Sequence, residues 1–229
     1  MAGEIIGKAE LVTADRDITE LSPETLLEII LSYVLPTSEV SASVSRIMGH
    51  FGSVSAAMEA DISDIARLLG GDMNAASLLK LAPDFGRYYC MDRLKGGKRF
   101  SNIDEIAEYC IFKYIKDKRE SYSVLMLDSG LRMLGIEKLA DGTACEVEVS
   151  FEALGSALFR YGAHGYILIH NHPGTDPYPS DADVMLTERL YAITAPFGKY
   201  LMEHIIISGN NYLPIMQLMR KNGYDFYSY

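Results

Sequence analysis

Two histidines and an aspartate in the second half of the chain have the types and spacing of a metal-binding set. His170 and His172 stand at positions i and i+2 at the end of a short apolar run. Side chains two apart on a strand point to the same side, so both imidazoles are expected to face one site. Asp183 follows in the first turn of a predicted helix, after a loop with three prolines. Such a loop can bring that turn back over the strand end.

Two imidazole nitrogens and one carboxylate oxygen form a suitable tripod for Zn²⁺ and leave the fourth tetrahedral position for water, as in catalytic zinc sites. Hydrolysis at neutral pH needs such a site because the metal lowers the pKa of its bound water to about 7. The residues alone leave a second interpretation open. In it, the histidines cap the strand and Asp183 only complements the helix dipole.

The elements that must position these residues change in character along the chain. Residues 1–21 are polar, and we expect a flexible, loosely attached tail. Residues 22–94 carry helical apolar patterns and capping signals, which predict a small all-helical domain whose last helix is disturbed by Pro83. The Lys-Gly-Gly-Lys-Arg segment at 95–99 is predicted to be the linker. Residues 101–229 then form the second domain.

The second domain mixes apolar runs with amphipathic segments. Helices are predicted from 101 to about 116, over 151–162 and from 180 onward, and strands over 121–128, 131–139, 165–170 and 200–208. The two kinds of element follow no simple βαβ rhythm. The pattern therefore predicts an α+β fold, with a sheet flanked by helices.

Composition and charge exclude several classes of protein. The formal net charge of −10 gives no long-range attraction to nucleic acid, so DNA contact would need a local basic patch. The three cysteines are widely spaced without a CxxC pair, which fits reduced thiols. Neither a signal-peptide pattern nor a membrane-length apolar stretch is present. We therefore expect a cytoplasmic protein without a membrane partner.

The motif around the histidines resembles a known signature. The pattern H-x-H-x7-S-x2-D is that of the JAMM/MPN+ (JAB) zinc hydrolases, and the stretch HNHPGTDPYPSDADVMLTERL is similar to that of the bacterial RadC family. The similarity covers about residues 101–213 strongly and 22–92 loosely. It extends to the strand RESYSVLMLDS at 119–129, to Gly142-Thr143 and to Gly162-Ala163.

The resemblance implies a fold and a mechanism. The fold is a JAB/MPN-type (cytidine-deaminase-like) α/β/α domain with a mixed sheet, preceded by a helix-hairpin-helix-like domain. One Zn²⁺ per chain would be held by His170, His172 and Asp183, with Glu120 as general base and Ser180 steadying the oxyanion. The implied activity is that of a zinc metalloprotease, a hydrolase that cleaves an amide or isopeptide bond in a polypeptide substrate of unknown identity.

Several of these residues also have a structural interpretation. Glu120 ends a run of charged residues at 116–120 that could simply be solvated, and Ser180 stands where a helix N-cap is expected. His204, in the last long strand, is expected to support the site or the fold rather than bind metal.

A second function remains open at this point, that of a DNA-repair-linked binding protein with a structural or vestigial metal site. The helix-hairpin-helix unit presents backbone N–H groups to phosphate at a G-x-G hairpin. Here Asp72 falls on the second glycine, where a carboxylate repels phosphate. A metal-dependent nuclease or deaminase is a third interpretation, and the missing PCxxC pair disfavours the deaminase. The oligomeric state stays undetermined.

Overall fold

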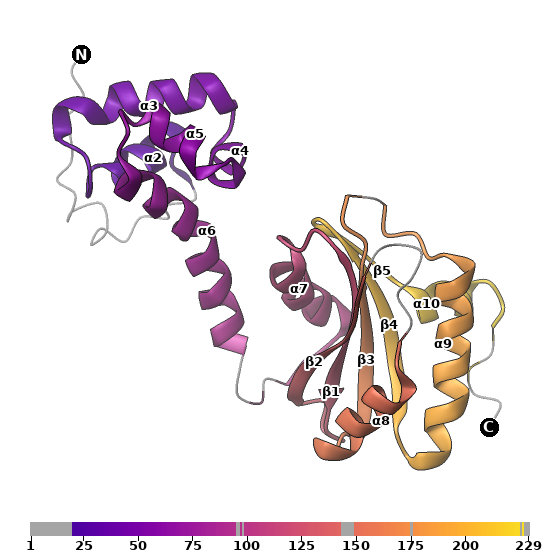
Figure 1. Ribbon diagram of the computed structural model, residues 1–229. Helices are drawn as coiled ribbons and strands as arrows, with labels where there is room; N and C mark the ends of the chain where they lie inside the picture. The colour runs from indigo at the N-terminus through magenta and orange to yellow at the C-terminus, as the bar shows by residue number, and fades with distance from the viewer. Residues whose placement is uncertain are drawn as a thin grey trace. The chain divides into compact units, whose positions relative to one another are not determined.

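The computed structural model describes residues 20–94, 97, 99–142, 149–174, 176–224 and 226 (Figure 1). Contacts within the chain divide it into two units, Met1–Tyr88 and Tyr89–Tyr229. The predicted tail lies outside the described residues up to position 19, and residues 95, 96 and 98 of the predicted linker do so too. The predicted domain boundaries therefore stay predictions, and each unit is described by itself.

The first unit consists of helices packed around one apolar core. They are α2 (Pro23–Leu31), α3 (Thr37–Phe51), α4 (Val54–Glu59), α5 (Ile62–Leu68) and the first part of α6 (Met73–Leu94). Leu31, Ile47 and Leu79 are fully buried in this core. The predicted disturbance at Pro83 does not end α6, which continues past it.

The second unit is built on a five-stranded mixed sheet in the order β2-β1-β3-β4-β5. The strands are β1 (Glu120–Leu127), β2 (Met133–Gly142), β3 (Gly165–Asn171), β4 (Tyr200–Ser208) and β5 (Asn211–Pro214). Neighbouring strands are antiparallel except β3 and β4, which are parallel. The predicted α+β class is confirmed.

Helices cover both faces of this sheet (Figure 1). On one face α7 (Ile103–Tyr114) packs through Ile106 and Cys110 against Leu125, Ile167 and Ile205. The other face carries α8 (Phe151–Arg160), α9 (Asp181–Thr194) and α10 (Ile215–Lys221) over a separate apolar cluster. Because both faces are covered, β3 is buried along its whole length, as its continuous apolar run predicts.

The pairing of β1 with β3 places the predicted site residues beside one another. Tyr122 pairs with His170, and Ser121 pairs with Asn171. The Asn171 side chain accepts from Ser121 Oγ at 2.6 Å and donates to the Arg119 carbonyl at 2.9 Å. These bonds fix the register at the strand ends, where a slip of one residue would turn His170 to the opposite face.

Among the residues that the structure describes, no helix has the length and apolar character needed to cross a bilayer.

The packing of the central strand β3 should contribute measurably to the free energy of unfolding. Ile167→Ala should lower the free energy of unfolding by about 2–5 kcal/mol, because it removes buried methyl groups and leaves a cavity. Ile193→Ala removes the same atoms from an exposed position on α9 and should change the free energy of unfolding by less than about 0.5 kcal/mol. Urea unfolding of both variants checks this, and equal losses would contradict the packing described.

Candidate metal centre

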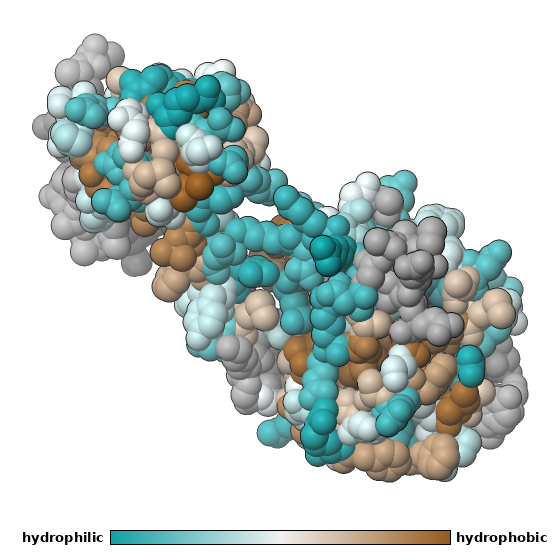
Figure 2. Space-filling model, in the orientation of Figure 1, coloured by the Kyte–Doolittle hydropathy of each residue, from teal (hydrophilic) through white to brown (hydrophobic). Residues whose placement is uncertain are grey.

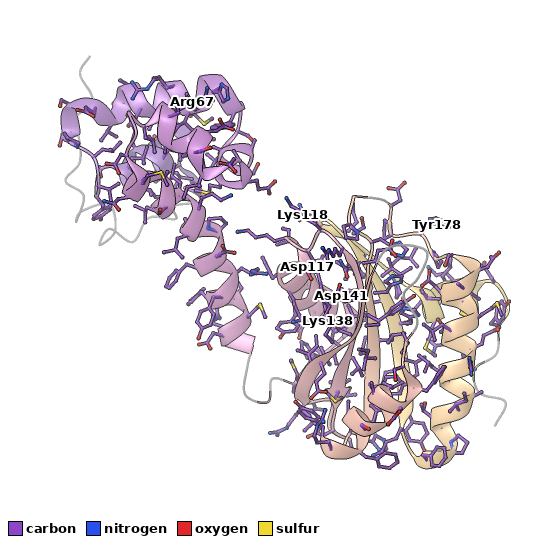
Figure 3. All side chains as sticks on the ribbon, viewed as in Figure 1. Arg67, Asp117, Lys118, Lys138, Asp141 and Tyr178 are labelled. Carbon is purple, nitrogen blue, oxygen red and sulfur yellow. The ribbon has the colours of Figure 1, made fainter. Side chains whose placement is uncertain are left out.

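The predicted site residues lie at one end of the sheet. His170 is buried near the end of β3, and His172 directly follows that strand, with its N–H donating to the Ile207 carbonyl at 2.7 Å. Glu120 begins β1 at the same end, which also holds Lys118 and the exposed loop residue Tyr178 (Figure 3). Ligand sites in open sheets with parallel strands commonly lie at such carboxyl ends.

Glu120, His170 and His172 form one cluster of donor atoms, which all lie within 4.8 Å of one another. Nε2 of His170 is buried, has no hydrogen-bond partner among the described residues, and lies 3.7 Å from a Glu120 carboxylate oxygen. The His170 and His172 rings meet edge to face, with centroids 4.3 Å apart. An unpartnered imidazole nitrogen is costly inside a protein unless something binds it.

Asp183 belongs to a second cluster, also built on His170, with His204 as its third member. One Asp183 oxygen accepts from the Tyr122 hydroxyl at 2.6 Å and contacts His170 Nδ1 at 2.8 Å. The other accepts from the Ser180 backbone N–H at 2.9 Å and the Ser180 hydroxyl at 2.6 Å. The structure thus joins each predicted ligand to His170, but His172 and Asp183 lie in different clusters.

These bonds decide the ionisation of the Asp183 carboxyl. Burial by itself raises its pKa, but the hydrogen bonds from His170, Ser180 and Tyr122 outweigh burial and hold the pKa far below its usual range. The same contact acts in the opposite direction on Tyr122, whose pKa is raised by burial and by the carboxylate that it faces. Asp183 is therefore a carboxylate, and Tyr122 is a neutral donor to it.

Ser180 is the N-cap of α9, in a reciprocal capping box with Asp183. Its hydroxyl donates to the Asp183 carboxylate and accepts from the Asp183 backbone N–H at 3.2 Å. The structural role that the sequence left open is thus present. The oxyanion role stays a prediction, and it requires the hydroxyl to exchange its Asp183 contact for the substrate.

His204 lies fully buried behind the site on β4. Thr187 donates its hydroxyl proton to the Asp183 backbone carbonyl at 2.6 Å, so His204 Nδ1 must be the donor in its 2.8 Å contact with Thr187 Oγ1. Nε2 of His204 then carries a lone pair, for which the described residues offer no partner. Burial, followed by the neighbouring His170, lowers the pKa of His204 to about 3.

His172 differs from His204 because its ring is only half-buried. Burial lowers its pKa, and the adjacent His170 lowers it further, while Asp183, Glu120 and a hydrogen bond to the Asp176 backbone act in the opposite direction. The net shift favours the neutral imidazole, which is the form that binds metal ions.

Two contributors were missed by sequence reasoning. Tyr122 stacks on His170 with ring centroids 3.9 Å apart, and Thr187 joins His204 to the start of α9. A signal existed for each. Tyr122 is two residues after Glu120, on the same side of a strand, and Thr187 is four residues after Asp183, on the same side of a helix.

The donor set fits a divalent transition metal. Imidazole nitrogens with carboxylate oxygens are ligands that Zn²⁺ uses, and here they gather around His170, whose buried Nε2 has no hydrogen-bond partner within the described part of the chain. The hydrogen bonds behind them orient the ligands, as partners outside the coordination shell do in metal sites.

Comparison with known proteins identifies the family. The model for the RadC-like JAB domain matches residues 100–220. The chain belongs to the RadC family. UPF0758 proteins are among its relatives. The Fusobacterium nucleatum protein is 26% identical, and the match covers 84% of this chain and 86% of the relative. The Carboxydothermus hydrogenoformans protein is 29% identical, and the match covers 84% of this chain and 85% of the relative. The Desulforudis audaxviator protein is 28% identical, and the match covers 93% of this chain and 91% of the relative. The predicted family is confirmed.

The contribution of the Tyr122 hydroxyl to the free energy of unfolding can be tested. Tyr122→Phe keeps the ring against His170 but removes a donor to a buried carboxylate, so the free energy of unfolding should fall by about 1.5–3 kcal/mol. Tyr166→Phe is the matched control, since it removes a buried hydroxyl that faces the neutral Thr194 and should cost about 1 kcal/mol. Urea unfolding measures both, and a larger loss for the control would contradict the charge-assisted bond.

The lowered pKa of the buried His204 should make the stability of the chelator-treated protein depend on pH. Below about pH 6.5 the unfolded chain protonates this histidine and the folded chain does not, so stability falls as the pH falls toward 3. From pH 6.5 to 5 its share of the loss is about 1.5 kcal/mol. His204→Asn keeps a donor for Thr187 but should remove that share.

His164, an exposed histidine of the same unit, supplies the control. His164→Asn should keep the full pH dependence of the unsubstituted chain when urea unfolding is repeated at each pH. If His204→Asn also keeps it, the buried neutral imidazole is the wrong assignment.

Proposed function

We propose that this RadC-family protein is a zinc-dependent hydrolase that cleaves an amide or isopeptide bond of a polypeptide. The observation that carries the proposal is the buried Nε2 of His170, which has no hydrogen-bond partner among the described residues and lies 3.7 Å from a Glu120 carboxylate oxygen, with His172 in the same cluster of donor atoms. His170, His172 and Asp183 would hold the ion. When bound, Zn²⁺ supplies Lewis acidity and brings the pKa of a coordinated water to about 7.

Glu120 would carry the proton in this reaction. Its side chain is partly exposed at the mouth of β1 and faces His170, whereas Asp183 is buried and its oxygens are already hydrogen-bonded. As general base, Glu120 takes a proton from the attacking water while the C–O bond forms. It returns that proton to the nitrogen as the C–N bond breaks, so an amine and a carboxylic acid leave.

The DNA-binding alternative gains no support from the hairpin before α6. A carboxylate oxygen of Asp72 accepts from the N–H groups of Asn74 and Ala75, both at 2.9 Å. Those are the kind of helix N-terminal donors that would otherwise face a phosphate. The hairpin therefore satisfies its own N–H groups with a negative charge, which repels the DNA backbone.

Metal content and hydrolysis together test the proposal. The unsubstituted chain should bind one Zn²⁺. His170→Ala and Asp183→Asn should each weaken binding by more than the roughly 10- to 100-fold that loss of an outer partner costs. Glu120→Gln should keep the metal but lower hydrolysis of a peptide library by about 10²- to 10⁴-fold. Elemental analysis after dialysis and mass spectrometry of the products measure these effects.

Glu108→Gln, on the opposite face of the unit, makes the same change of charge and should alter neither property. Loss of zinc from Glu120→Gln would make Glu120 a ligand rather than the base. Absence of zinc binding by the unsubstituted chain would refute the proposed function.

A further inference from the structure

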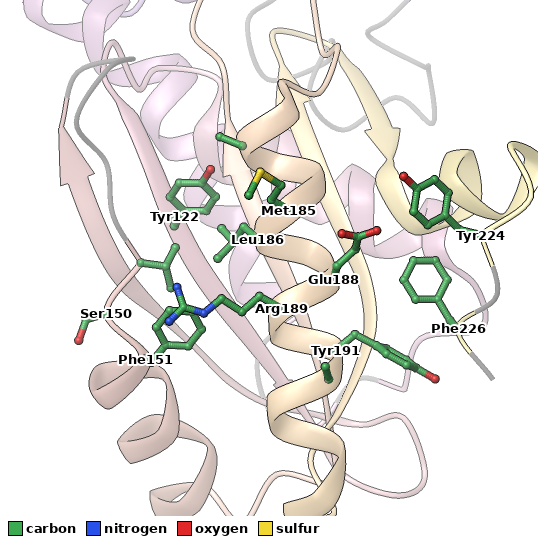
Figure 4. Close-up of a pocket in the computed structure, with 13 residues that line it drawn as sticks. Tyr122, Ser150, Phe151, Met185, Leu186, Glu188, Arg189, Tyr191, Tyr224 and Phe226 are labelled. Atoms are coloured by element: carbon green, nitrogen blue, oxygen red, sulfur yellow. The ribbon is translucent and has the colours of Figure 1, made fainter. Parts of the chain in front are cut away.

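A cavity of about 1200 Å³ lies along α9, beside the candidate metal centre (Figure 4). Part of it runs between α9 and the beginning of α8, and we call this part the α8–α9 groove. Hydrophobic residues gather on the surface in this region of the second unit (Figure 2). The groove is lined by Tyr122, Val149, Ser150, Phe151, Ala182, Met185, Leu186 and Arg189.

Helix α9 presents one stripe of side chains to the groove. Ala182, Met185, Leu186 and Arg189 stand at positions i, i+3, i+4 and i+7, which share one face of a helix. The Phe151 ring faces this stripe from the start of α8 (Figure 4), and Val149 also lines the cavity. The walls are therefore mainly apolar, and Arg189 is the only cation among the lining residues.

Arg189 contacts an aromatic ring and has no ion-pair partner among the described residues. Its guanidinium lies 4.3 Å from the centroid of the Phe151 ring, a cation–π contact. Among the residues that the structure describes, no carboxylate forms an ion pair with it within 4.0 Å. The one lining carboxylate, Glu188, projects from the other flank of α9 toward Tyr224 (Figure 4). Within the described part of the chain, the groove thus offers an exposed positive charge that packs on an aromatic ring and has no carboxylate partner.

The groove leads to the candidate centre. Tyr122 lines it, and the hydroxyl of that tyrosine donates to Asp183. Arg189 follows Asp183 by six residues on α9, a rise of about 9 Å along the helix axis. An extended peptide advances by about 3.3–3.6 Å per residue, so about three residues span the same distance.

We propose that the α8–α9 groove binds an extended segment of the polypeptide substrate and that Arg189 pairs with an acidic side chain about three residues from the bond to be cleaved. This inference rests on the proposed function and adds a substrate class to it. The apolar walls accept neighbouring aliphatic side chains, and the cation selects Asp or Glu at one position.

The net charge of the chain does not oppose such selection at short range. The formal charge is −10, but at physiological ionic strength exposed charges more than about 8 Å apart are largely screened. A carboxylate in contact with Arg189 experiences mainly that guanidinium. An internal acidic side chain is favoured over a chain terminus because the cavity continues along α9 past Arg189, toward Tyr191.

Two hexapeptide libraries test the proposal by binding alone. Both are acetylated and amidated, randomised at five positions, and carry either Glu or Gln at the fourth. Chelator-treated protein is immobilised, and retained peptides are quantified by mass spectrometry. The Glu library should be retained about 1.4- to 5-fold better, as expected for an exposed ion pair. Arg189→Gln should abolish the preference, and Arg189→Lys should keep most of it.

Arg160→Gln is the matched control, because Arg160 is another exposed arginine that lies against a tyrosine ring, on α8 outside the cavity lining. It should keep the preference for Glu. Equal retention of both libraries, or a preference that survives Arg189→Gln, overturns the inference. A preference confined to a third library, with a free C-terminus and no acidic side chain, also overturns the inference.

A parallel digestion with zinc-loaded protein separates the two proposals. Cleavage without selection for Glu would leave the hydrolase and remove the role of Arg189. Selection for Glu that depends on Arg189, without cleavage of any library, would keep the binding groove and refute the hydrolase.

Discussion

The buried carboxylate of Asp183 is the constraint on which the candidate centre depends. A side chain that is 2% exposed can stay ionised only if its oxygens are satisfied, and an unpaired buried charge costs several kcal/mol. Its donors come from three elements, with Tyr122 on β1, His170 on β3 and Ser180 at the start of α9. One charge therefore fixes two strand ends and a helix terminus at the same point.

Buried polar residues also connect the rest of α9 to the sheet. Its face toward the sheet carries Asp183, Thr187, Leu190 and Thr194, all buried, and three of these four are polar. Thr187 bonds to His204 on β4, and Thr194 bonds to Tyr166 on β3. Hydrogen bonds of fixed direction thus set the rotation of α9 on the sheet. That rotation turns Met185, Leu186 and Arg189 outward to line the groove, so site and groove depend on one helix orientation.

The sequence predicted those parts of the fold whose signals are local. The apolar run of β3 and the cap at Ser180 were both visible, and both are present. Helix α10, of seven residues, was missed because it is too short for a periodic pattern. The contact of Tyr122 with Asp183 spans 61 residues. It follows from the strand register and the helix orientation, which no local pattern contains.

The hydrogen bonds of Asp183 also bear on how folding and metal binding are related. An ionised carboxylate has about four acceptor positions, and Tyr122, His170 and the two Ser180 groups occupy that number here. Asp183 can become a ligand only when one of these contacts is exchanged, whereas His172 and Glu120 need no such exchange to approach His170. The protein's own hydrogen-bond donors stabilise the Asp183 carboxylate charge that a bound ion would otherwise stabilise. Folding of this unit is therefore expected to be independent of metal, unlike that of structural zinc domains, whose ligand charges have no alternative partner.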